Sequence, residues 1–198
     1  EGPKIRIAKI EFQGNVNFKR KKLLKQMETR QKRFPTFIFP GRFDQKKFES
    51  DIEKVKEFYM NNGWLDVDIG WEIAYSDDRK MYITGHIKEG ERYYVESLKI
   101  DGTSLFTVDE LKEKLKLQEG GPFFLDAVEK DTYQLRLSYG EQGYITALVK
   151  EKHTFGAEGA KVNVSFSVEE KDRHYIEKVK IVGNDKTRDN VIRRQLTF

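Results

Sequence analysis

The feature that most constrains this chain is an internal repeat, which opens each time with a short apolar segment that ends at a glycine. The segment occurs at residues 10–15, 98–103 and 179–184, and its glycines Gly14, Gly102 and Gly183 recur at similar intervals. Asn15 and Asn184 follow the first and third glycines, as is typical of a turn that leaves a strand. Apolar residues nine and thirteen positions after each glycine fall on one helical face. The pattern therefore predicts strand, turn and helix three times.

A second part of the unit recurs with every matched position shifted by the same amount, and it predicts a longer helix. Its apolar positions step by seven and four, as in an amphipathic helix, and each copy ends at a glycine suited to a helix C-terminus, Gly63 or Gly143. We expect these helices at about 44–61 and 126–141, with Asp44 and Asp126 as N-caps. The matched residues are Phe48, Asp51, Val55, Tyr59, Gly63 and Trp64 in one copy and Val128, Asp131, Leu135, Tyr139, Gly143 and Tyr144 in the other.

Each unit closes with two apolar segments of period two, which predict a β-hairpin. In unit one, apolar residues alternate with acidic and small ones from Leu65 to Tyr75, and the return strand contains Met81 to Ile87. In unit two the strands run out from Ile145 and back through Val162 to Val168. First strands are expected at 5–12, 94–100 and 175–182, and first helices near 18–28, 107–117 and 187–196, with Thr107 and Glu110 forming a capping box.

The order β-α-α-β-β predicts an α+β fold in which a three-stranded mixed sheet carries two helices on one face. The domains are expected at 1–91, with an insertion between its helices, at 92–173, and at 174–198, where only a truncated third start remains. Such a short third piece cannot bury enough apolar surface to fold alone, so we expect it to lean on unit two or on another molecule.

The composition and motifs favour a binding module over an enzyme. The chain has no cysteine and no apolar run long enough for a transmembrane helix. The histidines His86, His153 and His174 are isolated, so neither a metal site nor any other cofactor is expected. Carboxylate pairs such as Asp66 and Asp68 lie on a polar strand face, and no catalytic constellation is found.

Basic residues are concentrated before residue 44. Residues 1–43 contain 12 Lys and Arg against 3 Asp and Glu, and they include the four phenylalanines of the inter-helix insertion at 34–43. One interpretation is a solvated basic face with aromatic residues folded over the core. The other is a patch for a partner protein or a membrane surface, formed by Arg30, Lys32, Arg33, Phe37 and Phe39.

The strand ending in Gly-Asn, the two helices, and the motif Tyr-x3-Gly-Trp/Tyr at 59–64 and 139–144 resemble the POTRA repeat (polypeptide-transport-associated domain). The resemblance covers nearly the whole chain, and the third start, 183–194, resembles the barrel-proximal repeat of BamA-like proteins. It implies a periplasmic receptor or scaffold module of an outer-membrane protein assembly machine, attached to the outer membrane through its own downstream β-barrel. Implied partners are unfolded outer-membrane protein precursors and accessory assembly lipoproteins.

The outer strands of a three-stranded sheet carry unpaired backbone groups, which an extended client segment can extend by β-augmentation. By resemblance the first hairpin strand is the exposed edge, and the predicted client-strand residues are Leu65, Val67, Ile69, Trp71, Tyr144, Thr146 and Leu148. These strands can equally be outer strands that charged residues protect. The sequence is also compatible with a segment of a two-partner-secretion or TamA-like transporter, with a structural spacer, and with a KH-like nucleic-acid-binding module, although no nucleic-acid partner is expected.

Overall fold

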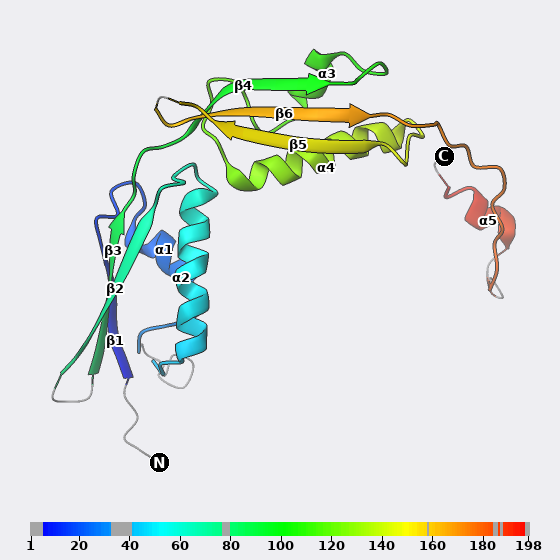
Figure 1. Ribbon diagram of the computed structural model, residues 1–198. Coiled ribbons are helices and arrows are strands. Elements are labelled where there is room, and N and C mark those ends of the chain that lie inside the picture. The colour runs from blue at the N-terminus through cyan, green and yellow to red at the C-terminus, as the bar shows by residue number, and fades with distance from the viewer. Residues whose placement is uncertain are drawn as a thin grey trace.

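A computed structural model describes residues 6–32, 41–76, 80–157, 159–183, 186 and 188–196. Two β-α-α-β-β units follow one another and form two arms of an arch, with a shorter third segment at the far end (Figure 1). We call the units repeat one and repeat two.

Repeat one consists of β1 (Arg6–Gln13), α1 (Arg20–Gln26), α2 (Gln45–Met60), β2 (Asp68–Tyr75) and β3 (Lys80–Lys88). Its strand order is β1-β3-β2, where β1 runs parallel and β2 antiparallel to the central β3. The predicted three-stranded mixed sheet is therefore confirmed, with the two hairpin strands side by side and the first strand on the far side of β3.

Repeat two has the same organisation. It consists of β4 (Tyr94–Asp101), α3 (Val108–Glu113), α4 (Leu125–Glu141), β5 (Leu148–Phe155) and β6 (Lys161–Glu169). The order is β4-β6-β5, again with one parallel and one antiparallel pairing. In both units the hairpin strand that comes first in the sequence lies at an edge of the sheet.

The helices of each repeat cover one face of its sheet, and on the arch both long helices, α2 and α4, lie on the concave side (Figure 1). Alternate residues of the central strands are buried, for example Ile83 in β3 and Val164 in β6, at 1% exposure each. Tyr59 and Tyr139 hold equivalent core positions and are fully buried. Each repeat thus has one core between its sheet and its helices.

Two of the three predicted N-terminal helix caps are confirmed. The Asp44 side chain accepts a hydrogen bond from the Lys47 amide, and Thr107 and Glu110 form the reciprocal capping box. Asp126 is not the N-cap of α4, because the helix already begins at Leu125 and Phe124 holds the cap position. Asp126 lies instead in the first turn, where its charge complements the helix dipole.

The repeated glycine has the same structural role in both complete units. Gly14 and Gly102 have φ of 80° and 81°, and a Cβ atom there would lie 2.1 Å from the carbonyl oxygen of Ile87 or Val168. Only glycine fits such a turn, because the chain leaves the first strand in close contact with the end of the last. Asn15 stabilises the turn by donating from its side chain to the Phe18 carbonyl at 2.7 Å.

Buried carboxylates fix the loops of both repeats. Asp51 accepts backbone hydrogen bonds from Glu28 and Thr29 at 2.6 and 2.7 Å. Its equivalent Asp131 accepts from Lys116 and Leu117 at 2.8 and 3.0 Å. Both acids lie on the long helix and hold the segment that follows the short helix, which explains why the acid recurs in the second copy. Burial raises the pKa of Asp131, against the lowering effect of these backbone donors.

The third segment differs from the prediction. No strand forms at 175–182 in the part of the chain that the structure describes, and only a short helix, α5 (Asp189–Arg193), follows. A strand needs a partner, and none of the described residues pairs with this segment. Gly183 has a φ of 76°, similar to those of Gly14 and Gly102, although nothing lies within 4 Å of the position its Cβ would take. Asn184 lies outside the described residues.

Candidate functional site

The candidate site is the outer border of β2. The amide of Ser76 donates to the Lys80 carbonyl at 3.0 Å, which fixes the hydrogen-bonding phase of the β2–β3 ladder. Because residues of an antiparallel pair alternate between facing the partner and facing away, every second β2 residue directs its N–H and C=O outward. The four outward residues are Ile69, Trp71, Ile73 and Tyr75. No described side chain or backbone group hydrogen-bonds to these outward groups.

The side chains of this outward row lie on the helix-facing side of the sheet. Ile69, Trp71 and Ile73 are half-buried and pack against the core of repeat one, whereas Tyr75 is 61% exposed. The ring of Trp71 packs edge-on against Phe48 of α2 at 5.1 Å between centroids. Free backbone groups and an apolar row therefore coincide along one border, beside α2.

The opposite border of the same sheet is closed by the chain itself. The Ile7 amide donates to the Gly41 carbonyl at 2.7 Å, and the Ile7 carbonyl accepts from Lys32 at 2.8 Å. Further along β1, the carbonyl of Ile10 accepts from the Arg20 side chain at 2.8 Å. The loop between α1 and α2, together with Arg20 of α1, thus occupies outward groups of Ile7 and Ile10, whereas none of the described residues bonds to the outward groups of β2.

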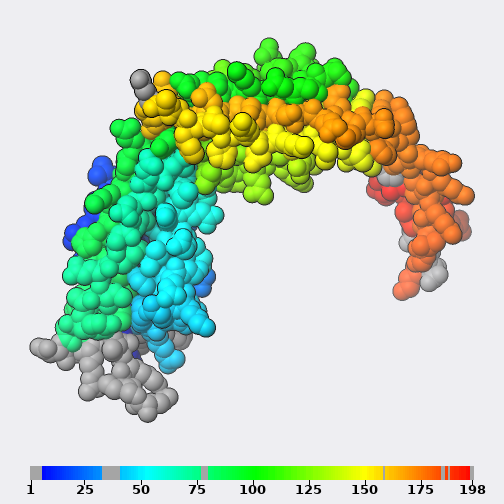
Figure 2. Space-filling view, in the orientation of Figure 1, coloured from blue at the N-terminus to red at the C-terminus, as the bar shows by residue number. Residues whose placement is uncertain are grey.

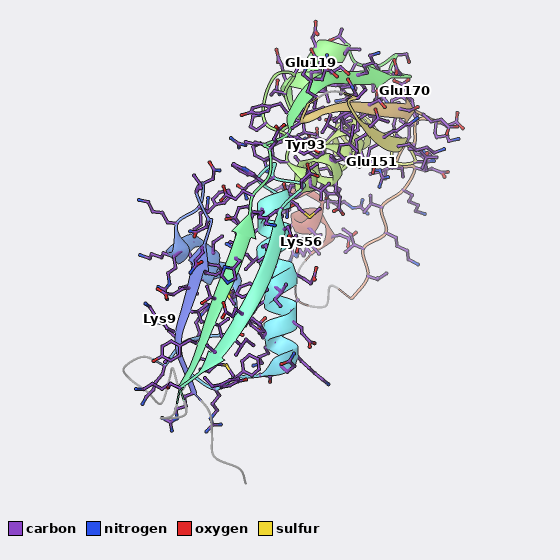
Figure 3. All side chains as sticks on the ribbon, turned by 60° about the vertical axis from the view of Figure 1, so that its left-hand side comes forward. Lys9, Lys56, Tyr93, Glu119, Glu151 and Glu170 are labelled. Carbon is purple, nitrogen blue, oxygen red and sulfur yellow. The ribbon has the colours of Figure 1, made fainter. Side chains whose placement is uncertain are left out.

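Repeat two closes its first strand in the same way. The Val95 amide donates to Gly121, its carbonyl accepts from Gly120, and the Leu98 amide donates to the Glu119 carboxylate at 2.8 Å. Figure 3 shows Glu119 beside β4. These bonds also account for the lowered pKa of Glu119, for which the Leu98 amide is the largest cause and Lys112 the next. In both repeats, therefore, the chain itself closes the edge at the first strand, and the first strand of the hairpin forms the other edge.

Only some of the predicted client-strand residues lie in the outward row of an edge strand. Ile69 and Trp71 belong to the outward row of β2. Leu65 and Val67 precede the strand: Leu65 packs against the core of repeat two, and Val67 is 4% exposed within the core of repeat one. The outer hairpin strands β2 and β5 both begin later than predicted, because a turn lies between each long helix and the strand that follows it.

In repeat two the predicted positions are displaced by one residue from the outward row. Tyr144 and Thr146 precede β5, and Leu148 is its first residue. The Gly156 amide donates to Lys161 at 2.9 Å, so that the backbone of Leu148 faces β6 and that of Val149 faces outward. Ile73 and Tyr75 complete the outward row of repeat one; they lie within the predicted edge segment Leu65–Tyr75 but were not among the predicted client-strand residues.

Only part of the predicted basic and aromatic patch can be placed. Arg30 is exposed, and its guanidinium donates to the carbonyls of Leu24 and Met27, which end α1. Lys32 is exposed, while its amide belongs to the closure of β1. Arg33, Phe37 and Phe39 lie outside the described residues. Arg30 therefore has a structural role as a C-terminal cap of α1, whatever it binds.

The contacts at the junction between the repeats were not predicted. The Tyr93 amide donates to the Gly63 carbonyl at 2.8 Å, its carbonyl accepts from Phe123 at 2.9 Å, and its hydroxyl donates to Asp66 at 2.8 Å. Figure 3 shows Tyr93 between the two repeats. The next linker begins alike, with the His174 amide donating to Gly143 at 2.8 Å. The glycine after each long helix is thus also the attachment point of the following linker.

The described residues offer no group of three or more potential metal ligands. Within the same residues, no helix has the length and apolar character that crossing a membrane requires. The buried Tyr59 hydroxyl donates to Glu89 at 2.9 Å, and burial, followed by this hydrogen bond, raises the pKa of Tyr59. That pair joins α2 to the end of β3, so its role is structural.

Comparisons with known proteins agree with this architecture. The family model POTRA, described as "Surface antigen variable number repeat", matches residues 5–90 and 93–171. The chain is 30% identical over 200 residues to the outer membrane protein assembly factor BamA of Neisseria meningitidis, covering 99% of this chain and 25% of that protein. It is also 30% identical over 204 residues to a putative outer membrane protein assembly factor of Treponema pallidum, covering 99% and 24%.

Among solved structures, the POTRA3-5 segment of Haemophilus influenzae BamA matches with a TM-score of 0.57 and 22% identity, over 96% of this chain and 76% of that one. This likeness supports the fold. The chain spans about a quarter of the length of the curated relatives named above. Two successive family matches, each over one of the two folded units, show that the chain belongs to the POTRA family and carries repeats of a BamA-like protein.

Proposed function

We propose that this chain is a periplasmic receptor and scaffold module of an outer-membrane protein assembly machine. In this proposal the β2 border takes an extended segment of an unfolded β-barrel precursor as an additional strand. The full-length protein would hold the module at the outer membrane through a downstream β-barrel, and accessory assembly lipoproteins would dock on it. The names of the relatives, which are assembly factors, support this role.

The observation that carries the proposal is the open border of β2. Its outward backbone groups can supply the hydrogen bonds of a new antiparallel or parallel neighbour. Backbone recognition tolerates many sequences, which suits a receptor for varied precursors. The apolar row of Ile69, Trp71 and Ile73 would accept alternate side chains of the client on the α2 side.

Backbone amide exchange followed by NMR tests this function directly. The probe is a peptide of alternating apolar and polar residues from the last strand of an outer-membrane β-barrel protein. We expect it to slow the exchange of the amides of Ile69, Trp71 and Ile73, while the amides of Ile7 and Ile10 in the closed β1 serve as internal controls. Binding without any protection along β2 would refute the proposed receptor edge.

The patch of Arg30, Lys32, Arg33, Phe37 and Phe39 stays a prediction for an accessory partner or the membrane surface. Charge reversal at Lys32 and Arg33 should weaken binding to liposomes that contain anionic lipids, if the patch serves that purpose. Equal binding of the variant and the unaltered chain would remove the membrane role.

A further inference from the structure

The two repeats present different outer edges, although their folds are equivalent. In β5 the residues that direct their backbone N–H and C=O groups away from β6 form an outward row of Val149, Glu151, His153 and Phe155. In the internal repeat these positions correspond to the outward row of β2, which is Ile69, Trp71, Ile73 and Tyr75. Repeat one thus shows two aliphatic and two aromatic residues, whereas repeat two places an acid and a histidine in the middle of the row.

The first outward carbonyl of β5 is already occupied. Arg136 of α4 donates from its Nη2 atom to the Val149 carbonyl oxygen at 3.1 Å. A guanidinium bonded to this carbonyl occupies an acceptor that an added strand would need, and an arginine can hold it with its planar set of donors. The equivalent residue of repeat one is Lys56 on α2, which forms no hydrogen bond with any described residue. Figure 3 shows Lys56 on α2 and Glu151 on β5.

The other end of β5 is held at the junction of the repeats. The Phe155 ring packs edge-on against Tyr93 at 5.8 Å between centroids. His153 packs between Phe155 at 5.9 Å and Phe123 at 6.1 Å. Figure 1 shows this hairpin end of β5 above the point where the chain passes from one repeat to the next. In the space-filling view the yellow surface of β5 reaches the blue-green surface of repeat one at the same place (Figure 2).

We propose that Arg136 closes the repeat-two edge, so that one client strand binds per pair of repeats and it binds at β2. This inference rests on the proposed function and adds that only one of the two repeats, repeat one, binds the client strand. A new strand needs several consecutive outward groups. With the Val149 carbonyl taken by Arg136, and with the ring of Phe155, which stays 58% exposed, in contact with Tyr93, β5 offers a shorter uninterrupted row of outward groups than β2, which disfavours strand addition there. Arg136 thereby acts as the residue that selects the docking edge.

The test uses the whole chain, the barrel-strand peptide of the preceding section, and the Arg136→Ala variant. Amide exchange and titration calorimetry are recorded together. We expect one peptide per chain with protection at Ile69 and Ile73 for the unaltered chain. The variant should bind a second peptide and gain protection at Val149 and Glu151. Lys56→Ala, the matched change in repeat one, should leave the stoichiometry at one.

A converse variant keeps the inference testable if Arg136→Ala perturbs repeat two. Lys56→Arg places a guanidinium at the equivalent position beside β2 and should weaken peptide binding there. The inference is overturned if Arg136→Ala folds, as the retained protection of Val164 and Phe166 would show, and still binds one peptide at β2. It is also overturned if the unaltered chain protects β5 as strongly as β2. Absence of protection along β2 in every variant would instead refute the proposed function.

Discussion

The guanidinium of Arg92 lies over the indole of Trp64, with 4.7 Å between Cζ and the ring centroid. Arg92 belongs to the linker and Trp64 to the turn after α2, so this contact attaches the linker to repeat one. The Nε atom of Arg92 also donates to the Asn62 carbonyl at 3.3 Å. Together with the bonds of Tyr93, it makes the junction a packed surface and not a free hinge.

Replacing Arg92 with Ala should loosen this junction without unfolding either repeat. A cation–π contact of this kind stabilises by about 0.5–2 kcal/mol. We expect the NMR rotational correlation times of the two repeats, which are similar when the junction is intact, to diverge in the variant. Arg173→Ala, the equivalent change at the next linker, is the control and should leave them matched. Unchanged relaxation in Arg92→Ala would show that the junction does not depend on this contact.

Gly14→Ala should destabilise repeat one by roughly 2–4 kcal/mol, because it combines a left-handed backbone conformation with an obstructed Cβ position. Both tryptophans of the chain, Trp64 and Trp71, lie in repeat one, so urea unfolding monitored by tryptophan fluorescence reports on this unit. Gly70→Ala is the control, since nothing lies within 4 Å of its Cβ position in β2. The account of the turn is wrong if both variants unfold at the same urea concentration.

Acid should selectively weaken repeat two through Glu170. Burial, its largest influence, acts to raise the pKa, but hydrogen bonds from Ser104 and Leu105 prevail and lower the pKa of Glu170 to about 2. A carboxyl group whose folded pKa is depressed adds stability above its unfolded pKa of about 4.3. That contribution is lost as the pH falls from there towards 2.

The measurement is chemical unfolding of the whole chain at a series of pH values between 2 and 6, followed by circular dichroism, for the unaltered chain and for Glu170→Gln. The variant should be less stable at neutral pH and should lose less stability on acidification. Asp172→Asn, a change at an exposed neighbour, controls for the removal of a charge. Parallel pH profiles for Glu170→Gln and the unaltered chain would contradict the role of this carboxylate.

The repeat pattern was sufficient to predict the elements of both complete units, because each apolar position recurs in the same structural context. It also identified Gly14 and Gly102, where a contact with the last strand leaves no room for a side chain. The sequence placed the start of the hairpin strands too early. Leu65 continues the apolar alternation, but it packs against repeat two at the junction and not in the sheet.

The edge could be predicted only in part. Alternation shows which residues share a face, but the phase of the hydrogen-bond ladder depends on the turn that closes the hairpin, seen in the bonds from Ser76 to Lys80 and from Gly156 to Lys161. That phase decides that Val149 and not Leu148 faces outward. The contact between Arg136 and Val149 joins a helix to a strand and leaves no periodic signal.

The central claim is that β2 recognises the backbone of an extended client. The most direct measurement compares the affinity of the barrel-strand peptide with that of two sequence-identical peptides, N-methylated at alternate residues along one edge or the other. We predict that methylation along the edge that faces β2 abolishes protection of Ile69 and Ile73 and weakens binding by about tenfold or more, while methylation of the opposite edge is tolerated. Equal affinity of all three peptides would contradict backbone recognition by this chain.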